Sequence, residues 1–159
     1  MIEEVKKFKA ETRNKIDIAL LAICFTAFTF LASNSPQILS ENIFISIQLV
    51  FAIPLFVNNL FCRIKQVYKD PKEKWEEIGF LSFTLAYGFF INVVGLLMAL
   101  FVPIGVVLLF FALSMLLTVM RTYIQAYYEP AKIKRGFYRE ILYLVLVIFL
   151  GILPALGVY

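Results

Sequence analysis

The sequence predicts an all-α integral membrane protein, in which one domain, residues 1–159, forms a bundle of five transmembrane helices. Hydrophobic residues make up 62% of the chain, and its mean hydropathy is +0.86. The charges are segregated, because residues 18–40, 42–62, 78–120 and 141–159 contain no Asp, Glu, Lys or Arg. Uncharged apolar stretches of about 18 or more residues are typical of membrane spans. This composition excludes a soluble enzyme, a nucleic-acid-binding module and a disordered chain.

The five spans follow from these stretches. The first is predicted at about 16–33, the second at 43–61 and the fifth at 140–158. The long stretch 78–120 requires two spans, at about 78–100 and 104–126, because a single helix of that length would be about twice as long as the bilayer is thick. We expect the break at Phe101-Val102-Pro103-Ile104-Gly105, since proline removes a backbone donor and glycine permits a tight reversal.

The distribution of lysine and arginine predicts the orientation. Segments 1–15, 62–77 and 121–139 each carry five such residues, whereas segments 34–42 and 101–103 and the C-terminal end carry none. Because cytoplasmic segments are enriched in positive residues, this alternation predicts a cytoplasmic N-terminus, an outside C-terminus and a multi-pass protein of the cell membrane. A cleaved signal peptide ending near Ala32-Ser33 is the alternative, but Glu3, Glu4 and Glu11 in the N-terminal region argue against it.

Aromatic side chains gather at the same predicted boundary. By this topology the cytoplasmic edge of the membrane carries Tyr68, Trp75, Tyr123, Tyr127, Tyr128, Tyr138 and Tyr143. Amphipathic rings prefer that depth, and a basic surface attracts anionic headgroups. We therefore expect the lipid bilayer, with anionic lipids at the basic cytoplasmic face, as a partner. The simpler interpretation is that these cations only determine topology.

Helical spacing assigns small and polar residues to four stripes, each on one face of a span. They are Ala19, Ala22, Thr26, Thr29 and Ser33 in the first span; Gln48, Ala52, Leu55 and Asn59 in the second; Thr84, Gly88, Asn92, Gly95 and Ala99 in the third; and Ser114, Thr118, Arg121 and Gln125 in the fourth. Small residues let helices approach closely, and an amide can bond across the interface. We expect the four stripes to pack against each other, with a pore or substrate path as the alternative.

Two prolines lie inside predicted spans. Pro54 and Pro154 each leave the carbonyl four residues earlier, at Val50 and Leu150, without its usual donor. A kink is the expected consequence, and a coordinating carbonyl is the alternative. In the fifth span, Gly151 and Ala155 are expected to seat the helix on the bundle.

One polar pocket is predicted at the cytoplasmic side. At about 1.5 Å per residue, Asn58 and Asn59 lie about 23 Å along the second span from its outer end, and Arg121 lies about 25 Å along the fourth. Ionisable groups at membrane depth usually face the protein interior or a wet cavity. We expect Arg121 to supply the charge, Asp17 to neutralise it and the Asn pair to donate hydrogen bonds. The full predicted set is Asp17, Asn58, Asn59, Thr84, Tyr87, Asn92 and Arg121.

Packing accounts for the same residues without a pocket. In that alternative Arg121 extends to the interface, Asp17 belongs to a first helical turn and the two asparagines bond each other. A channel lined by Thr84, Asn92 and backbone carbonyls is a further interpretation.

The residue types that are absent limit the chemistry. The chain has no histidine and only two cysteines, Cys24 and Cys62, both in apolar stretches. Without histidine there is no imidazole base and no His-bearing metal site, and we expect both cysteines to serve packing. No cofactor, metal, catalytic residue or nucleic-acid partner is predicted. The sequence favours a non-enzymatic accessory, assembly or scaffold subunit of a membrane complex, partnered by another membrane protein or a second copy. A small oligomeric channel or transporter with a cytoplasm-facing polar pocket is the alternative.

Overall fold

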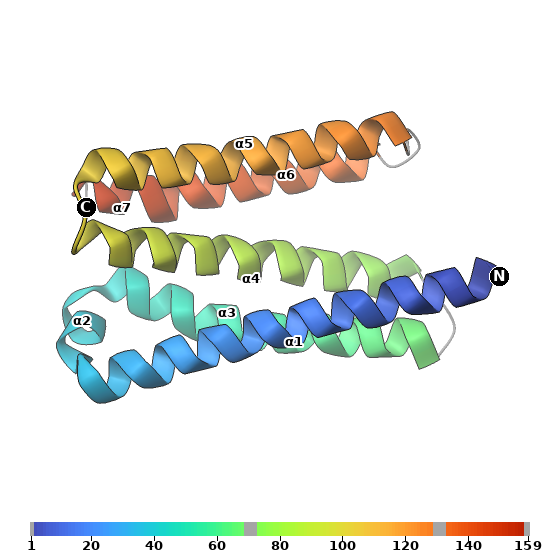
Figure 1. Ribbon diagram of the computed structural model, residues 1–159, viewed down its shortest axis with the longest axis horizontal. Coiled ribbons are helices and arrows are strands. Elements are labelled where there is room, and N and C mark those ends of the chain that lie inside the picture. Colours follow the sequence, from blue (N-terminus) through green and yellow to red (C-terminus); the bar gives the residue numbers. More distant parts are fainter. Residues whose placement is uncertain (1, 69–72, 129–132, 158–159) are drawn as a thin grey trace.

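The computed structural model describes residues 2–68, 73–128 and 133–157, and every regular element in these ranges is helical (Figure 1). The elements in chain order are α1 (Ile2–Asn34), α2 (Pro36–Glu41), α3 (Ile43–Tyr68), α4 (Glu73–Ala99), α5 (Ile104–Tyr128), α6 (Ile133–Val147), the π-helix η2 (Ile148–Ile152) and α7 (Leu153–Ala155).

Five helices are long and apolar enough to cross a membrane, which confirms the predicted number of spans. The apolar segments are Asn14–Asn34, Ile43–Lys65, Trp75–Ala99, Ile104–Ile124 and Gly136–Ala155. They match the predicted spans to within a few residues at most ends. The described structure is therefore an all-helical bundle with five helices of membrane-spanning length and hydropathy.

Helix α4 lies at the centre of the bundle. It pairs with α3 on one side and with α6 and α5 on the other, while α1 packs on α3 (Figure 1). Half of the residues in the most apolar segment of α4 are buried inside the protein. The corresponding share is 17% for α1 and 11% for α5. The outer helices therefore present most of their apolar surface outward, as expected for helices that face lipid.

The two ends of the bundle differ in character. The N-terminus and the helix ends that flank residues 69–72 and 129–132 lie at one end, whereas α2, the turn after α4 and α7 lie at the other (Figure 1). Four cations lie within about two turns of the helix ends at the first end: Arg63, Lys65, Arg121 and Arg139. We call it the basic end, and the opposite one the α2 end.

Three apolar clusters hold the helices together. Leu31, Ile45, Leu49, Val93 and Leu96 join α1, α3 and α4 towards the α2 end. Cys24, Ala52, Phe56 and Ala86 join the same helices further in. Val107, Phe111, Tyr143 and Val147 join α5 and α6. Cys24 lies fully buried in the second cluster, which confirms its predicted packing role.

The reversal between the third and fourth spans occurs where it was predicted, but glycine does not make it. Helix α4 ends at Ala99 and α5 begins at Ile104. The amides of Phe101 and Val102 both donate to the carbonyl of Met98. Gly105 lies inside α5 with nothing near its Cβ position, and the expectation that it permits the turn was wrong. Proline at the helix start is sufficient, because its missing donor is not needed there.

The fifth span is not one regular α-helix. Residues Ile148–Ile152 form a π-helix, and the span then ends in the short helix α7 around Pro154. Single π-turns inside α-helices are rare and release backbone carbonyls from their regular partners. As predicted, Gly151 seats this span on the bundle: it is buried, and a Cβ there would lie 2.4 Å from Oδ1 of Asn92 and 2.9 Å from Cε1 of Phe111.

The packing of the predicted stripes is confirmed for α3 and α4 and wrong for α1. Gln48, Ala52 and Asn59 are buried on α3, and the α4 stripe is buried from Thr84 to Gly95. By contrast, all five stripe residues of α1 are exposed. The buried face of α1 carries Asp17, Cys24 and Leu31, spaced seven residues apart. On α5, Ser114 and Thr118 are half-buried and Arg121 is exposed, while the side chain of Gln125 lies outside the described set.

Candidate functional site

A buried amide network joins three helices. Nδ2 of Asn92 on α4 donates to Oε1 of Gln48 on α3 at 2.8 Å and to the carbonyl of Leu146 on α6 at 3.1 Å. Nε2 of Gln48 donates to the carbonyl of Leu150 at 2.8 Å and to that of Phe44 at 3.0 Å. Leu150 is the residue whose carbonyl Pro154 deprives of a donor. The amides of α3 and α4 therefore satisfy carbonyls of the irregular fifth span.

The network holds α3, α4 and the fifth span together, and one of its side-chain oxygens has no partner within the described residues. Gln48 and Asn92 are 1% and 0% exposed, and among the described residues Oδ1 of Asn92 has no hydrogen-bond partner. This oxygen lies against Gly151. Interhelical amide bonds of this kind stabilise membrane bundles. Asn92 was considered as a channel-lining residue, but in the structure it bonds α4 to α3 and α6.

Asp17 pairs with Arg63, not with the predicted Arg121. Nε of Arg63 on α3 donates to Oδ2 of Asp17 on α1 at 3.2 Å, and the two side chains are 14% and 3% exposed. Arg121 lies on α5, which is on the far side of α4 from α1 (Figure 1). Its side chain is exposed. The charged pair of the predicted pocket is therefore split between opposite sides of the bundle.

The two adjacent asparagines of α3 have different environments. Nδ2 of Asn58 donates to the hydroxyl of Ser82 on α4 at 2.7 Å. Asn59 is completely buried, and neither Nδ2 nor Oδ1 has a hydrogen-bond partner among the described residues. The packing alternative expected the two asparagines to bond each other, and they do not. Buried polar groups normally bond to the protein or to ordered water, so Asn59 is the residue of the predicted set whose amide the neighbouring helices do not satisfy.

Thr84 and Tyr87 lie on α4 and pack inside the bundle. The hydroxyl of Thr84 donates to the carbonyl of Phe80 at 2.9 Å, within its own helix. Tyr87 stacks against Phe83 at 5.9 Å and against Tyr143 at 6.0 Å between ring centroids. The hydroxyl of Tyr143 in turn shares a 2.5 Å hydrogen bond with Ser114. These aromatic contacts join α4, α5 and α6, and they do not meet the Asp17–Arg63 pair.

A second charged cluster lies between α5 and α6 at the basic end, and sequence reasoning missed it. The Arg139 guanidinium donates to the hydroxyl of Thr122 at 2.8 Å, lies over the ring of Phe80 at 4.6 Å and approaches Oε1 of Glu140 at 4.0 Å. Glu140 is 7% exposed, and its Oε1 has no hydrogen-bond partner within the described ranges. The available signal was two ionisable residues at the edge of a span, where burial is costly without a partner.

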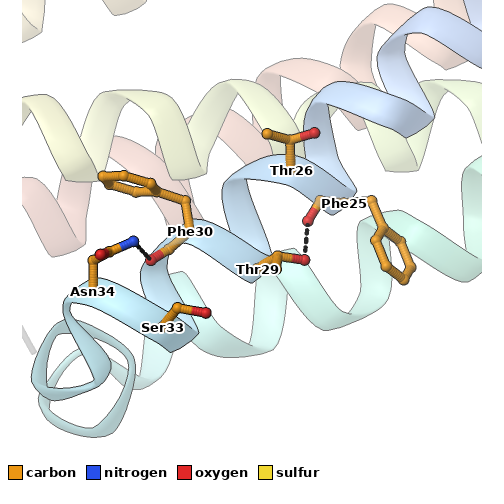
Figure 2. Close-up of a pocket in the computed structure, with 6 residues that line it drawn as sticks. All are labelled: Phe25, Thr26, Thr29, Phe30, Ser33 and Asn34. Carbon is orange, nitrogen blue, oxygen red and sulfur yellow. Dashed lines mark hydrogen bonds between the residues drawn. The ribbon is translucent and has the colours of Figure 1, made fainter.

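The outward face of α1 carries a shallow hollow (Figure 2). It has a volume of about 380 Å³ and is lined by Phe25, Thr26, Thr29, Phe30, Ser33 and Asn34. The hydroxyl of Thr29 donates to the carbonyl of Phe25 at 2.9 Å, and the amide of Asn34 donates to that of Phe30 at 3.2 Å. Thr29 and Asn34 are therefore satisfied by their own helix, which lets them face lipid or another helix.

The described side chains do not assemble a metal-binding cluster. Among the side chains that the structure describes, no group of three or more Cys, Asp or Glu residues is placed to hold a metal ion. Comparisons of the chain with profiles of known protein families, with curated proteins and with solved structures gave no match. The fold and site define an all-helical bundle with five helices long and apolar enough to cross a membrane, and the polar groups of this bundle are largely used between its own helices.

Proposed function

We propose that this protein is a non-enzymatic accessory, assembly or scaffold subunit that binds a transmembrane helix of a larger membrane complex through the outward face of α1. The proposal includes a cytoplasmic N-terminus and basic end, an outside C-terminus, location in the cell membrane and attraction of anionic lipids to the basic end. The observation that carries it is the exposure of the small and polar stripe of α1.

The α1 stripe has the spacing of a helix-packing seam. Ala19, Ala22, Thr26, Thr29 and Ser33 follow one another at intervals of three and four residues, and all five are exposed. In a bilayer, where lipid tails are as apolar as leucine, helices associate by close packing of small residues and by interhelical hydrogen bonds. The lipid-facing side of α5 is different, since it is lined by large residues such as Leu109, Leu113 and Leu117.

The use of the interior polar groups also favours this class over transport. Gln48, Asn92 and the carbonyls of Leu146 and Leu150 bond one another, and Asn58 bonds Ser82. A substrate path would need such groups to face an open space. Here they hold α3, α4 and α6 together.

Site-directed photocrosslinking in native membranes tests the proposal. A benzoylphenylalanine at Thr29 is expected to give one adduct that contains a transmembrane peptide of another protein, while the same probe at Leu113 on α5 gives none. Ala22→Leu should abolish the Thr29 adduct because it fills the seam, and Leu109→Phe on α5 should leave it unchanged.

Two results would overturn the proposal. An adduct that joins two copies of this chain would make the α1 face a self-association surface and the protein a homo-oligomer. Absence of any adduct, together with solute flux in vesicles reconstituted with the purified protein, would establish the transport alternative.

A further inference from the structure

We infer that the basic end of the bundle contains a short, dead-ended water inlet bordered by α1, α3 and α4, which hydrates the buried Asp17–Arg63 pair and ends at Asn59. The inference does not depend on the proposed function. It rests on three orphaned polar atoms, on the positions of their residues along two antiparallel helices and on the apolar cluster beyond them.

The orphaned atoms require both a donor and an acceptor. Within the described ranges, Oδ1 of Asn14 and both Oδ1 and Nδ2 of Asn59 are buried without hydrogen-bond partners. Two of these atoms accept hydrogen bonds and one donates. Buried polar groups in native proteins are hydrogen-bonded, and ordered water supplies the partner where the protein does not. Water is the small molecule that meets both needs, since it donates and accepts.

Helix geometry places the orphaned residues on either side of the ion pair. Asn14 is three residues before Asp17 on α1, and Asn59 is four residues before Arg63 on α3. Residues three or four apart share one helix face. Because Arg63 contacts Asp17 and α1 and α3 run in opposite directions (Figure 1), Asn14 lies nearer the basic end and Asn59 lies further in. The seven helical steps between them span about 10 Å along the bundle.

The inlet is closed on the inside. Phe56, three residues before Asn59, and Cys24, seven residues after Asp17, belong to the apolar cluster with Ala52 and Ala86. All four are fully buried. On the α4 side, Gly79 lies so close that a Cβ there would be 2.8 Å from Cβ of Cys62 and 3.4 Å from Oδ1 of Asn59. Water reaches Asn59 only from the basic end and goes no further.

The two cysteines provide the readout. Cys62 lies between Asn59 and Arg63 in the sequence of α3, and its Cβ faces Gly79 of α4, as Oδ1 of Asn59 does. Cys24, by contrast, lies in the apolar cluster that closes the inlet. Both are free and buried. Thiol modification needs the thiolate and access for the reagent, so a small hydrophilic methanethiosulfonate reports water at each position.

The experiment compares single-cysteine variants of the full chain in open membrane fragments, where both faces meet the reagent. With Cys24→Ala, Cys62 is expected to react about tenfold faster or more than Cys24 does in the Cys62→Ala variant, because only Cys62 adjoins water. A matched control for depth is Phe61→Cys in a chain without the other two cysteines. Phe61 adjoins Cys62 but is 60% exposed on the outer surface, so this thiol should react slowly.

An apolar replacement tests the role of Asn59 itself. Asn59→Leu should slow the reaction of Cys62 towards the rate of Cys24, while Asn58→Leu, whose amide bonds Ser82, should leave it unchanged. Equal rates for Cys62 and Cys24, or equal rates for Cys62 and the cysteine at 61, would overturn the inference. If Asn59→Leu fails to fold, the comparison among the three thiols still decides it.

Discussion

Asn92 on α4 donates a 2.8 Å hydrogen bond to Gln48 on α3, and both residues are buried at the place where the fifth span departs from α-helical geometry. Gln48 then donates to the carbonyl of Leu150 and Asn92 to that of Leu146. The irregular backbone of the π-helix is thus compensated by two side chains from other helices. This arrangement follows the rule that backbone polar groups in a membrane must be satisfied within the protein.

Loss of Asn92 should therefore destabilise the bundle. Asn92→Leu leaves Oε1 of Gln48 and the carbonyl of Leu146 without their donor, and the free energy of unfolding is expected to fall by about 1–2 kcal/mol. Unfolding followed by circular dichroism during titration with a denaturing detergent measures the change.

A double-mutant cycle separates this bond from simple packing. If the two amides act as one unit, Gln48→Leu combined with Asn92→Leu should cost less than the sum of the single substitutions. Strict additivity would show that the Asn92–Gln48 bond contributes nothing of its own.

The ring of Phe111 occupies space that is free only because residues 95 and 151 are glycines. A Cβ on Gly95 would lie 2.2 Å from Cζ of Phe111, and one on Gly151 would lie 2.9 Å from Cε1 of the same ring. Gly95→Ala is therefore expected to lower the free energy of unfolding by about 1–3 kcal/mol through overpacking. Thermal unfolding in detergent measures the effect.

Gly105 on α5 is the matched control for the glycine substitution. Nothing lies within 4 Å of its Cβ position, so Gly105→Ala should be neutral or stabilise by up to about 1 kcal/mol, since alanine favours the helix. Phe111→Leu should partly rescue Gly95→Ala. Equal effects at positions 95 and 105 would contradict the close approach of α4 and α5.

The Asp17–Arg63 pair should matter more than the exposed Arg121. Arg63→Gln removes the guanidinium that donates to the buried carboxylate of Asp17, and a hydrogen bond to a charged group contributes about 1.5–3 kcal/mol. Arg121→Gln removes an exposed charge and should change stability by no more than about 0.5 kcal/mol. Detergent-titration unfolding of both variants makes the comparison, and similar losses would show that Arg63 is not specially placed.

The proposed topology predicts opposite locations for the C-terminal end and for the segment that follows α3. Because the three arginine- and lysine-rich segments adjoin the basic end, a periplasm-active reporter fused after Tyr159 should be active, and the same reporter after Lys69 should be inactive. A reporter that works only in the cytoplasm should give the reverse pattern. Equal activity at both positions would contradict a five-span chain held in one orientation.

Sequence reasoning was most reliable where a property depends on a single segment. The number of spans and the position of the break after Ala99 follow from local composition, and the structure confirms both. The burial of Gln48 and Asn92 and the freed carbonyl of Leu150 also follow from helical spacing and proline chemistry. None of these required knowledge of which helices are neighbours.

Sequence reasoning failed where the answer depends on neighbours. Depth alone suggested that Asp17 pairs with Arg121, because both lie near the same membrane surface, but α4 separates α1 from α5 and Asp17 meets Arg63. The α1 stripe was assigned to the interior, yet Thr29 bonds its own backbone and faces outward. The charged cluster of Arg139 and Glu140 was missed for the same reason, since its partner Thr122 belongs to another helix.

By itself, the sequence determined that the chain has five helices long and apolar enough to cross a membrane, since transfer into hydrocarbon depends on the length and polarity of each segment. The tertiary structure alone decided which face of each helix is buried and which polar groups meet. The physical reason is that lipid and protein interior are similarly apolar, so hydrophobicity cannot rank the faces of a span. Close contacts such as Gly151 on Asn92, and shared hydrogen bonds such as Gln48 to Leu150, make that choice.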